Sequence, residues 1–463
     1  MRLWMLLILM SLSASATGQA LDGLIDGFDE APPTGKASDD ILDGFEDDSV
    51  RPAATSLSRQ AVRRLRLGGY ASLAGSWSYQ RQAPAPAQAD HRGLSRARAK
   101  AQLELDWRPR DGWQAYTSAA GYYDGMFALK GREGFTTEYL DSEEHELEMR
   151  ELWLAWRLKR VDLRFGRQIL AWGKSDSIRV VDVVNPLDFR VPGLVDIEDL
   201  RLPVTMLRSN VYAGSWTFTL ALIPEIRQDR LPVYGSDYYP LPIAPPPEDV
   251  PETSLENTEF AFAASGAFAG WDLSLHAADT WQDQPWLAPQ GPGMARRYGR
   301  RQMLGIASNV ATGNWLLKQE LAWTDGLRFF AGTGSYSRIN GLVGADYSGF
   351  DNTTLSVEVM LQHINQFDAV LAAAPDYAEE DGGQVALRYS GAFWRERLQL
   401  TVLALWLGPM AEQGGLGRVS ARYALGDALF LTVGGLVYKG GDSPFFQALA
   451  RNDRLFAELR RDF

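Results

Sequence analysis

Residues 96–107 read RARAKAQLELDW, and the character of the side chain changes at every second position. The even-numbered residues are basic, acidic or amide side chains, whereas the odd-numbered residues are Ala or Leu and end on Trp107. Because successive side chains of a β-strand point to opposite faces, this stretch predicts a strand with one polar and one apolar face. In a transmembrane barrel the apolar face meets lipid, and a Trp at its edge lies at the headgroups.

The same period of two recurs along the chain from residue 66 onward, for example at 355–362 and 398–406. Short turn sequences such as 108–112 separate some of these runs. Long polar or proline-rich stretches separate others, namely 81–94, 131–144, 225–257 and 281–296. Short turns at one end and long loops at the other are typical of outer-membrane barrels. The sequence therefore predicts an all-β fold for residues 66–463, a transmembrane antiparallel β-barrel of about 16–18 strands.

The first twenty residues have the layout of a secretory signal peptide. Arg2 precedes a short apolar run at 3–12, and small residues follow up to Ala20. The run is shorter than a bilayer-spanning helix, so cleavage is a better interpretation than a retained membrane anchor. The chain has no cysteine, which excludes a lipoprotein anchor, a disulfide framework and thiolate metal sites. We expect the mature protein in the cell outer membrane.

Residues 21–65 form an acidic segment that we expect to be a disordered arm in the periplasm. Residues 21–50 hold ten Asp or Glu and one Lys, so most of the chain's net charge of −12 belongs to them. The heptad LIDGFDE at 24–30 is echoed by ILDGFED at 41–47. The arm is either a plain spacer or a pair of peptide ligands for a periplasmic partner; an EF-hand spacing of calcium ligands is absent. The partner-docking candidates are Asp26, Gly27, Phe28, Asp43, Gly44 and Phe45.

The last strand ends on an aromatic residue, because Leu455, Leu459 and Phe463 share one face of an alternating run. A terminal strand of this kind resembles the signal that the barrel-assembly machinery reads, and Phe463 is the candidate for that contact. A soluble β-sandwich or propeller does not explain such a terminus. Outer-membrane lipid and the assembly machinery are thus expected partners.

Residues 166–203 break the alternation and predict a loop folded into the barrel. Pro186, Pro192 and Pro203 cannot donate to a strand ladder. Arg167, Lys174 and Arg179 are expected to pair with Asp176, Asp182 and Asp188 along the inner wall. These residues either only lock the loop in place or form a constriction that contacts a substrate. The candidates are Gly166, Arg167, Gln168, Trp172, Gly173, Lys174, Asp176, Asn185, Pro186 and Asp188.

This block also carries a family resemblance. Gly-Arg-Gln at 166–168, Trp-Gly at 172–173 and Asn-Pro-x-Asp at 185–188 resemble a large family of bacterial outer-membrane barrels known as a domain of unknown function. The first of these motifs is similar, more distantly, to the alginate-export barrel family. The resemblance implies gene neighbours that encode an inner-membrane transporter of the resistance-nodulation-division type and a lipid-binding-like periplasmic protein. It therefore implies movement of a hydrophobic or lipid-like molecule.

Catalysis is not expected. The four histidines are scattered, and neither a G-x-S-x-G elbow nor an H-x-x-x-H metal pair occurs. We expect no cofactor, no metal and no nucleic acid. A plugged receptor would need a larger barrel. The sequence favours a conduit for a hydrophobic or lipid-like substrate, coupled to a periplasmic or inner-membrane partner. Two alternatives stay open: a porin or exporter for polar solutes or polysaccharide, and a structural or assembly protein that docks a periplasmic complex through its arm.

Overall fold

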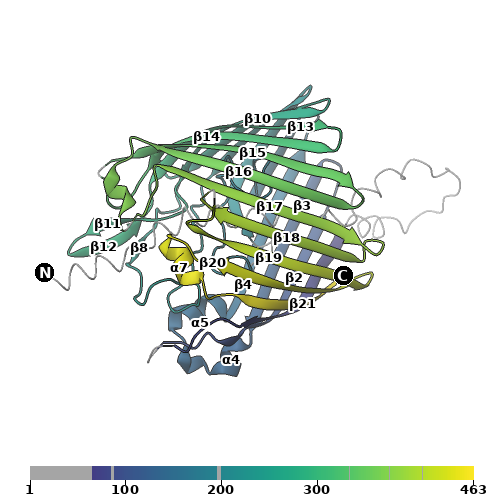
Figure 1. The fold of residues 1–463 in the computed structure, drawn as a ribbon. Helices are drawn as coiled ribbons and strands as arrows, with labels where there is room; N and C mark the ends of the chain where they lie inside the picture. The colour runs from purple at the N-terminus through teal and green to yellow at the C-terminus, as the bar shows by residue number, and fades with distance from the viewer. Residues whose placement is uncertain (1–64, 85–87, 195–199, 333, 375, 409) are drawn as a thin grey trace.

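A computed structural model (Figure 1) describes residues 65–84, 88–194, 200–332, 334–374, 376–408 and 410–463. The signal peptide, almost all of the arm and the six docking candidates within the arm lie outside these residues. The first strand begins at Leu65, one residue before the expected start of the barrel.

Eighteen strands form one closed antiparallel sheet in the described part of the chain, because β1 pairs with both β2 and β21. The predicted all-β barrel is confirmed, at the upper end of the expected strand number. The barrel strands are β1 (Leu65–Ser78), β2 (Gly93–Trp107), β3 (Trp113–Asp124), β4 (His145–Arg157), β5 (Val161–Gln168), β6 (Val204–Ala213), β7 (Trp216–Ile223), β9 (Glu259–Phe268), β10 (Trp271–Trp281), β13 (Arg300–Thr312), β14 (Trp315–Leu327), β15 (Tyr336–Phe350), β16 (Thr353–Asn365), β17 (Asp381–Phe393), β18 (Leu398–Leu407), β19 (Gly414–Gly426), β20 (Leu429–Lys439) and β21 (Arg454–Asp462).

The remaining elements are short and lie in the connections. A separate three-stranded sheet and five short helices are described: β8 (Glu248–Asp249), β11 (Trp286–Gln290), β12 (Gly293–Arg297), α4 (Met126–Lys130), η2 (Arg132–Gly134), α5 (Thr137–Glu143), η3 (Ala369–Ala372) and α7 (Pro444–Leu449). None of the helices in the described ranges is long and apolar enough to cross a membrane.

The period-two patterns place apolar side chains outside and polar ones inside, as expected. On β2, Leu103 is 54% exposed while its neighbour Gln102 is 7% exposed. On β14, Leu321 points outward, whereas Glu320 is buried on the inner face. The side chains that face the lumen are therefore the ones that decide function.

The two ends of the barrel differ. Tight turns such as 108–112 and 313–314 lie at the same end as the C-terminus, which we call the short-turn end (Figure 1). The long connections and all of the short helices lie at the other end, the loop end. Outward-facing aromatic residues gather at the short-turn end, where a girdle at the membrane interface is expected. They include Trp107, Trp156, Trp271, Trp315 and Phe463.

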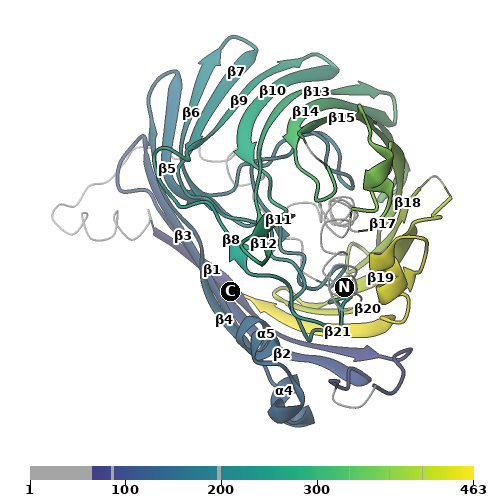
Figure 2. The same ribbon diagram turned by 90° about the vertical axis from the view of Figure 1, so that its left-hand side faces the viewer.

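The chain between β5 and β6 enters the barrel as predicted, although the inward part begins later than residue 166. Gly166, Arg167 and Gln168 still belong to β5, so the lumen segment begins at residue 169, and the structure describes it over 169–194 and 200–203. Seen from the loop end, this chain and the β7–β9 connection lie inside the ring of strands (Figure 2). Apolar residues of the segment, such as Ile178 and Phe189, pack against inward-facing Ala, Leu and Met side chains of the wall. The main core of the molecule thus sits inside the barrel.

Candidate functional site

Two wall carboxylates hold the lumen segment by its backbone. Glu320 of β14 accepts hydrogen bonds from the backbone N–H groups of Lys174, Ser175 and Val181, the latter two at 2.9 and 3.2 Å. Glu358 of β16 accepts from the N–H groups of Asp176 at 2.9 Å and Ser177 at 3.0 Å, and from the Ser175 hydroxyl at 2.7 Å. Both glutamates are at most 4% exposed. They satisfy backbone donors that a buried irregular segment would otherwise leave unpaired.

Lys318 balances the charge of this anchor. Its ammonium group contacts Asp176, lies 2.9 Å from Asp346 and lies 3.7 Å from Glu358. The lysine side chain is 2% exposed, so burial without such partners would be costly. Strands β14, β15 and β16 therefore present a charged patch that fixes residues 174–181 of the lumen segment.

The glycines of the sequence motif are required by close backbone approach. Gly166 has φ +126°, and a Cβ there would collide with the Leu152 carbonyl oxygen on β4. Gly173 has φ +94°, and a Cβ there would lie 2.9 Å from the Glu320 carboxylate. Only glycine combines this backbone conformation with the absence of a side chain. Gly173 thus allows the lumen segment to lie against the Glu320 carboxylate. The ring of Trp172 packs on that of His276, with 4.8 Å between the ring centres.

Gln168 and Asn185 close the base of the lumen segment. Gln168 is fully buried and donates to the carbonyl oxygens of Gly166 and Met206, both at 3.2 Å. Asn185, also fully buried, accepts from the Leu170 N–H at 2.7 Å and donates to the Leu202 carbonyl at 2.9 Å. The Pro186 carbonyl accepts from the Leu202 N–H at 2.8 Å. The hydrogen bonds of these motif residues connect the two ends of the lumen segment.

The expected pairing of charges within the lumen segment is largely wrong. Only Arg179 and Asp182 pair as predicted, at 3.5 Å. Arg167 pairs with Glu225 at 3.2 Å, and Lys174 with Asp272 at 2.6 Å; Asp176 binds Lys318. The segment runs across the lumen, so Lys174 and Asp176 meet charged groups of the wall strands instead of the partners expected within the segment.

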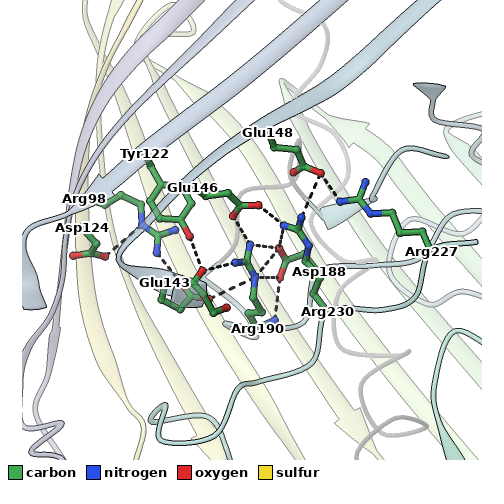
Figure 3. A network of polar contacts seen from close by, with 11 residues as sticks. Arg98, Tyr122, Asp124, Glu143, Glu146, Glu148, Asp188, Arg190, Arg227 and Arg230 are labelled. Atoms are coloured by element: carbon green, nitrogen blue, oxygen red, sulfur yellow. Dashed lines mark hydrogen bonds and ion pairs between the residues drawn. The ribbon is translucent and has the colours of Figure 1, made fainter. Parts of the chain in front are cut away.

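Asp188 joins the largest ionic cluster, which we call the partition: Arg98, Glu143, Glu146, Glu148, Asp188, Arg190, Arg227 and Arg230 (Figure 3). Arg190 of the lumen segment is central. It lies 2.6 Å from Asp188, 2.8 Å from Glu146 and 3.5 Å from Glu143, and it donates to the Ser142 carbonyl at 2.8 Å. Arg230 of the β7–β9 connection contacts Glu146 and lies 3.5 Å from Asp188.

The partition holds four arginines and four carboxylates, and Asp124, 3.3 Å from Arg98, adds a fifth carboxylate at its edge, so its charges nearly balance. Burial alone would raise the pKa of the Asp188 carboxyl, but attraction and hydrogen bonding from Arg190, helped by Arg230, lower it to about 2. The carboxylate is therefore ionised at neutral pH, which keeps both arginines in place. Five parts of the chain meet here: β2, α5, β4, the lumen segment and the β7–β9 connection.

Two cavities lie on opposite sides of the partition. The lumen cavity has a volume of about 1060 Å³, and its lining runs from Asn352 and Glu396 at the short turns to Val191 and Leu194 of the lumen segment. The loop-end cavity has a volume of about 710 Å³ and is lined by prolines and tyrosines of the β7–β9 connection. Both cavities are lined by Glu146, Arg190 and Arg230. The two cavities thus meet at the partition.

The β7–β9 connection is latched to the opposite side of the barrel mouth. Asp237 pairs with Arg454 at 2.9 Å, its backbone carbonyl accepts from the Asn452 amide at 2.6 Å, and the Arg454 guanidinium lies 4.6 Å from the Tyr238 ring centre. Burial alone would raise the pKa of Asp237, but Arg454, with His91 and Arg81, lowers it to about 2.

The low pKa of Asp237 makes its contact with Arg454 sensitive to acid. A carboxyl whose pKa is about 2 in the folded state and about 3.9 in the unfolded state contributes about 2–3 kcal/mol above pH 4, which is lost as the pH falls from about 4 to about 2. Asp237→Asn is therefore expected to be less stable than the unchanged protein at pH 5, with the difference shrinking toward pH 2. Urea unfolding in detergent at both pH values measures this; a constant difference would contradict it.

The closed sheet, the apolar outer face and the aromatic girdle define a transmembrane β-barrel of the outer-membrane type. Residues 86–463 match the model of DUF1302, described as a protein of unknown function, and the chain belongs to this family. The resemblance drawn from the motifs at 166–188 is thus confirmed. Nothing among the curated proteins matches the sequence.

Solved structures share the fold at very low identity. OccAB2 of Acinetobacter baumannii is 9% identical with a TM-score of 0.52, covering 87% of this chain and 98% of that one. OccAB3 of the same organism is 11% identical with a TM-score of 0.52, covering 87% and 99%. A BenF-like porin from Pseudomonas fluorescens is 12% identical with a TM-score of 0.49, covering 86% and 97%. At these identities the likeness concerns the fold alone.

The sequence motif covered only part of the site. It led to Asp188 but not to Arg190, although the two are neighbours in the same block. Glu320 and Glu358 are ordinary inward polar positions of strands, and the pattern gave no sign that they anchor the segment. Arg227 and Arg230 lie in a stretch expected only as a long loop.

Proposed function

We propose that this protein is a gated conduit of the outer membrane rather than an enzyme or a purely structural barrel. The observation that carries the proposal is the pair of cavities that meet at Glu146, Arg190 and Arg230 inside one barrel. A solid structural barrel has no need for a lumen cavity of about 1060 Å³ that extends to the short turns. Charged constrictions in lumens are the usual means by which pores select what passes.

The lining supports a substrate with an apolar body. Val191, Leu194, Leu403 and Phe456 line the lumen cavity. Such side chains favour a ligand that removes apolar surface from water. We therefore keep a hydrophobic or lipid-like molecule as the proposed cargo, in preference to a small polar solute.

We also propose that the short-turn end faces the periplasm, and that the conduit is coupled there to a periplasmic or inner-membrane partner. Short turns lie on the periplasmic side in barrels of this class. The first strand begins at this end with Leu65, so the chain that precedes it joins the barrel where the lumen cavity extends to the turns. A partner that binds the acidic repeats at 24–30 and 41–47 would then be close to the cavity.

Recordings in planar bilayers test the conduit. The unchanged protein is expected to give small or infrequent current steps because the partition closes the path. Deletion of residues 21–50 is expected to leave these steps unaltered and to abolish co-purification of a periplasmic partner. A structural or assembly protein would give no steps with or without the arm, and that result would overturn the proposal.

A further inference from the structure

Outside the partition, cationic side chains outnumber anionic ones along the lining of the lumen cavity. Of the charged side chains that line the cavity, three arginines and four carboxylates belong to the partition and are paired within it. The others are seven cations and two anions, Glu396 and Glu458. The cations are Arg96, Lys100, Arg150, Arg388, Arg418, Arg422 and Arg460.

Asp462, a neighbouring carboxylate outside the lining, offsets part of this excess. Asp462 lies 2.7 Å from Arg460 and 4.0 Å from Arg422, so one carboxylate serves two arginines. Aromatic rings also hold the guanidinium groups: Arg460 lies 3.7 Å from the Tyr70 ring centre, and Arg418 lies 4.9 Å from that of Phe456. A ring positions a guanidinium without neutralising its charge. The cavity therefore has a positive potential, which a low-dielectric wall strengthens.

Two of these arginines lie level with each other on the wall. Arg388 of β17 and Arg418 of β19 are both paired in register with Leu403 of the strand between them. Strands are about 4.8 Å apart, so the two backbone positions are about 10 Å apart across the curved wall. Leu403 is 2% exposed and faces the same cavity. Two cations thus flank an apolar side chain, and Phe456 adds to the apolar surface of the cavity.

We propose that the lumen cavity binds organic anions that carry an apolar chain, with the anionic group between Arg388 and Arg418 and the chain against Leu403 and Phe456. This inference rests on the proposed conduit and names the class of its cargo. Arginine is the residue best suited to carboxylate and phosphate groups because its planar donors match their oxygens. The apolar neighbours explain why the cargo is an amphipathic anion rather than an inorganic one.

Titration calorimetry with three matched probes tests the proposal on the full-length protein in an uncharged detergent. The probes are octanoate, octylammonium and octanol, which share one chain length and differ in charge. Octanoate is expected to bind at least about tenfold more tightly than octylammonium, and its affinity to fall as the salt rises from about 0.1 M to about 1 M. Octanol is expected to bind weakly and without salt dependence.

Variants locate the site. R388Q/R418Q is expected to lose the preference for octanoate, whereas R388K/R418K keeps much of it because the charges remain. The matched control R108Q/R110Q removes two charges from the β2–β3 turn, outside the cavity, and is expected to bind as the unchanged protein does. Heat-modified mobility on gels checks that each barrel is folded.

The outcomes separate this proposal from the conduit. Equal binding of octanoate and octylammonium, or no binding of any probe, would overturn the proposed cargo while current steps in bilayers still supported a conduit. Absence of steps in every form would overturn the conduit whatever the probes bind. Octanoate binding that survives in R388Q/R418Q would also contradict the assigned site.

Discussion

Arg190→Ala is expected to open the path between the two cavities and to produce current steps several-fold larger than those of the unchanged protein. The substitution removes one of the three side chains that line both cavities and leaves Glu143, Glu146 and Asp188 without their central cation. Arg98 still pairs with Glu143, and Arg230 with Glu146 and Asp188, but the lost cation leaves the partition with a net negative charge. The resulting repulsion loosens the lumen segment from β4. Removing one partner of a buried ion pair costs about 3–5 kcal/mol. Because the Arg190 side chain is 12% exposed, we expect the lower end, about 3 kcal/mol.

Planar-bilayer recordings and urea unfolding measure the two effects of this substitution separately. Arg92→Ala is the matched control: Arg92 pairs with Asp90 at 2.7 Å, but both side chains are about half exposed, so little loss of stability and no change in conductance are expected. An Arg190→Ala protein that is folded, destabilised and no more conductive than the unchanged chain would show that the partition is not the barrier.

The barrel was predictable from the sequence because its strands obey a strict period of two. RARAKAQLELDW at 96–107 assigns the inner and outer faces of β2 without ambiguity, and membrane burial leaves no competing arrangement. The departure from this period marked the lumen segment almost to the residue. The predicted loop begins three residues too early, because Gly166, Arg167 and Gln168 are the last residues of β5. Gly166, with φ +126°, interrupts the alternation of polar and apolar residues but does not end the strand.

The partition and the anchor were not predictable in the same way. Pairing such as Arg190 with Glu146, or Lys174 with Asp272, joins residues that lie far apart in sequence and come together only when the barrel closes. The charge of a residue and its position on a strand predict that its side chain faces the lumen. They do not predict which residue of the lumen segment pairs with it. The ion-pair partner depends on the path of the lumen segment through the barrel. No local pattern in the sequence of the segment predicts that path.

Glu358→Ala is expected to release the lumen segment while the barrel stays closed. The carboxylate accepts two backbone N–H groups and one hydroxyl of the segment, and hydrogen bonds to charged groups contribute about 1.5–3 kcal/mol each. Loss of the anchor also leaves Lys318 with one charge partner fewer. The eighteen strands keep their own ladder, since none of these bonds joins two strands. The expected loss is therefore local, of about 3 kcal/mol or more.

Limited trypsin digestion measures this release, because the segment contains Lys174, Arg179 and Arg190 as cleavage sites. The unchanged protein is expected to resist cleavage there, and Glu358→Ala to be cut within 169–203 while its folded mobility on gels is retained. Glu104→Ala removes an inward carboxylate of β2 whose described hydrogen bond is to Gln102, and it is expected to leave the segment protected. Glu358→Gln should be intermediate, because the amide keeps one acceptor oxygen but turns two donors toward the segment's N–H groups. If the segment of folded Glu358→Ala is as resistant as that of the unchanged protein, the other contacts of the segment, not the carboxylate anchor, hold it in the lumen.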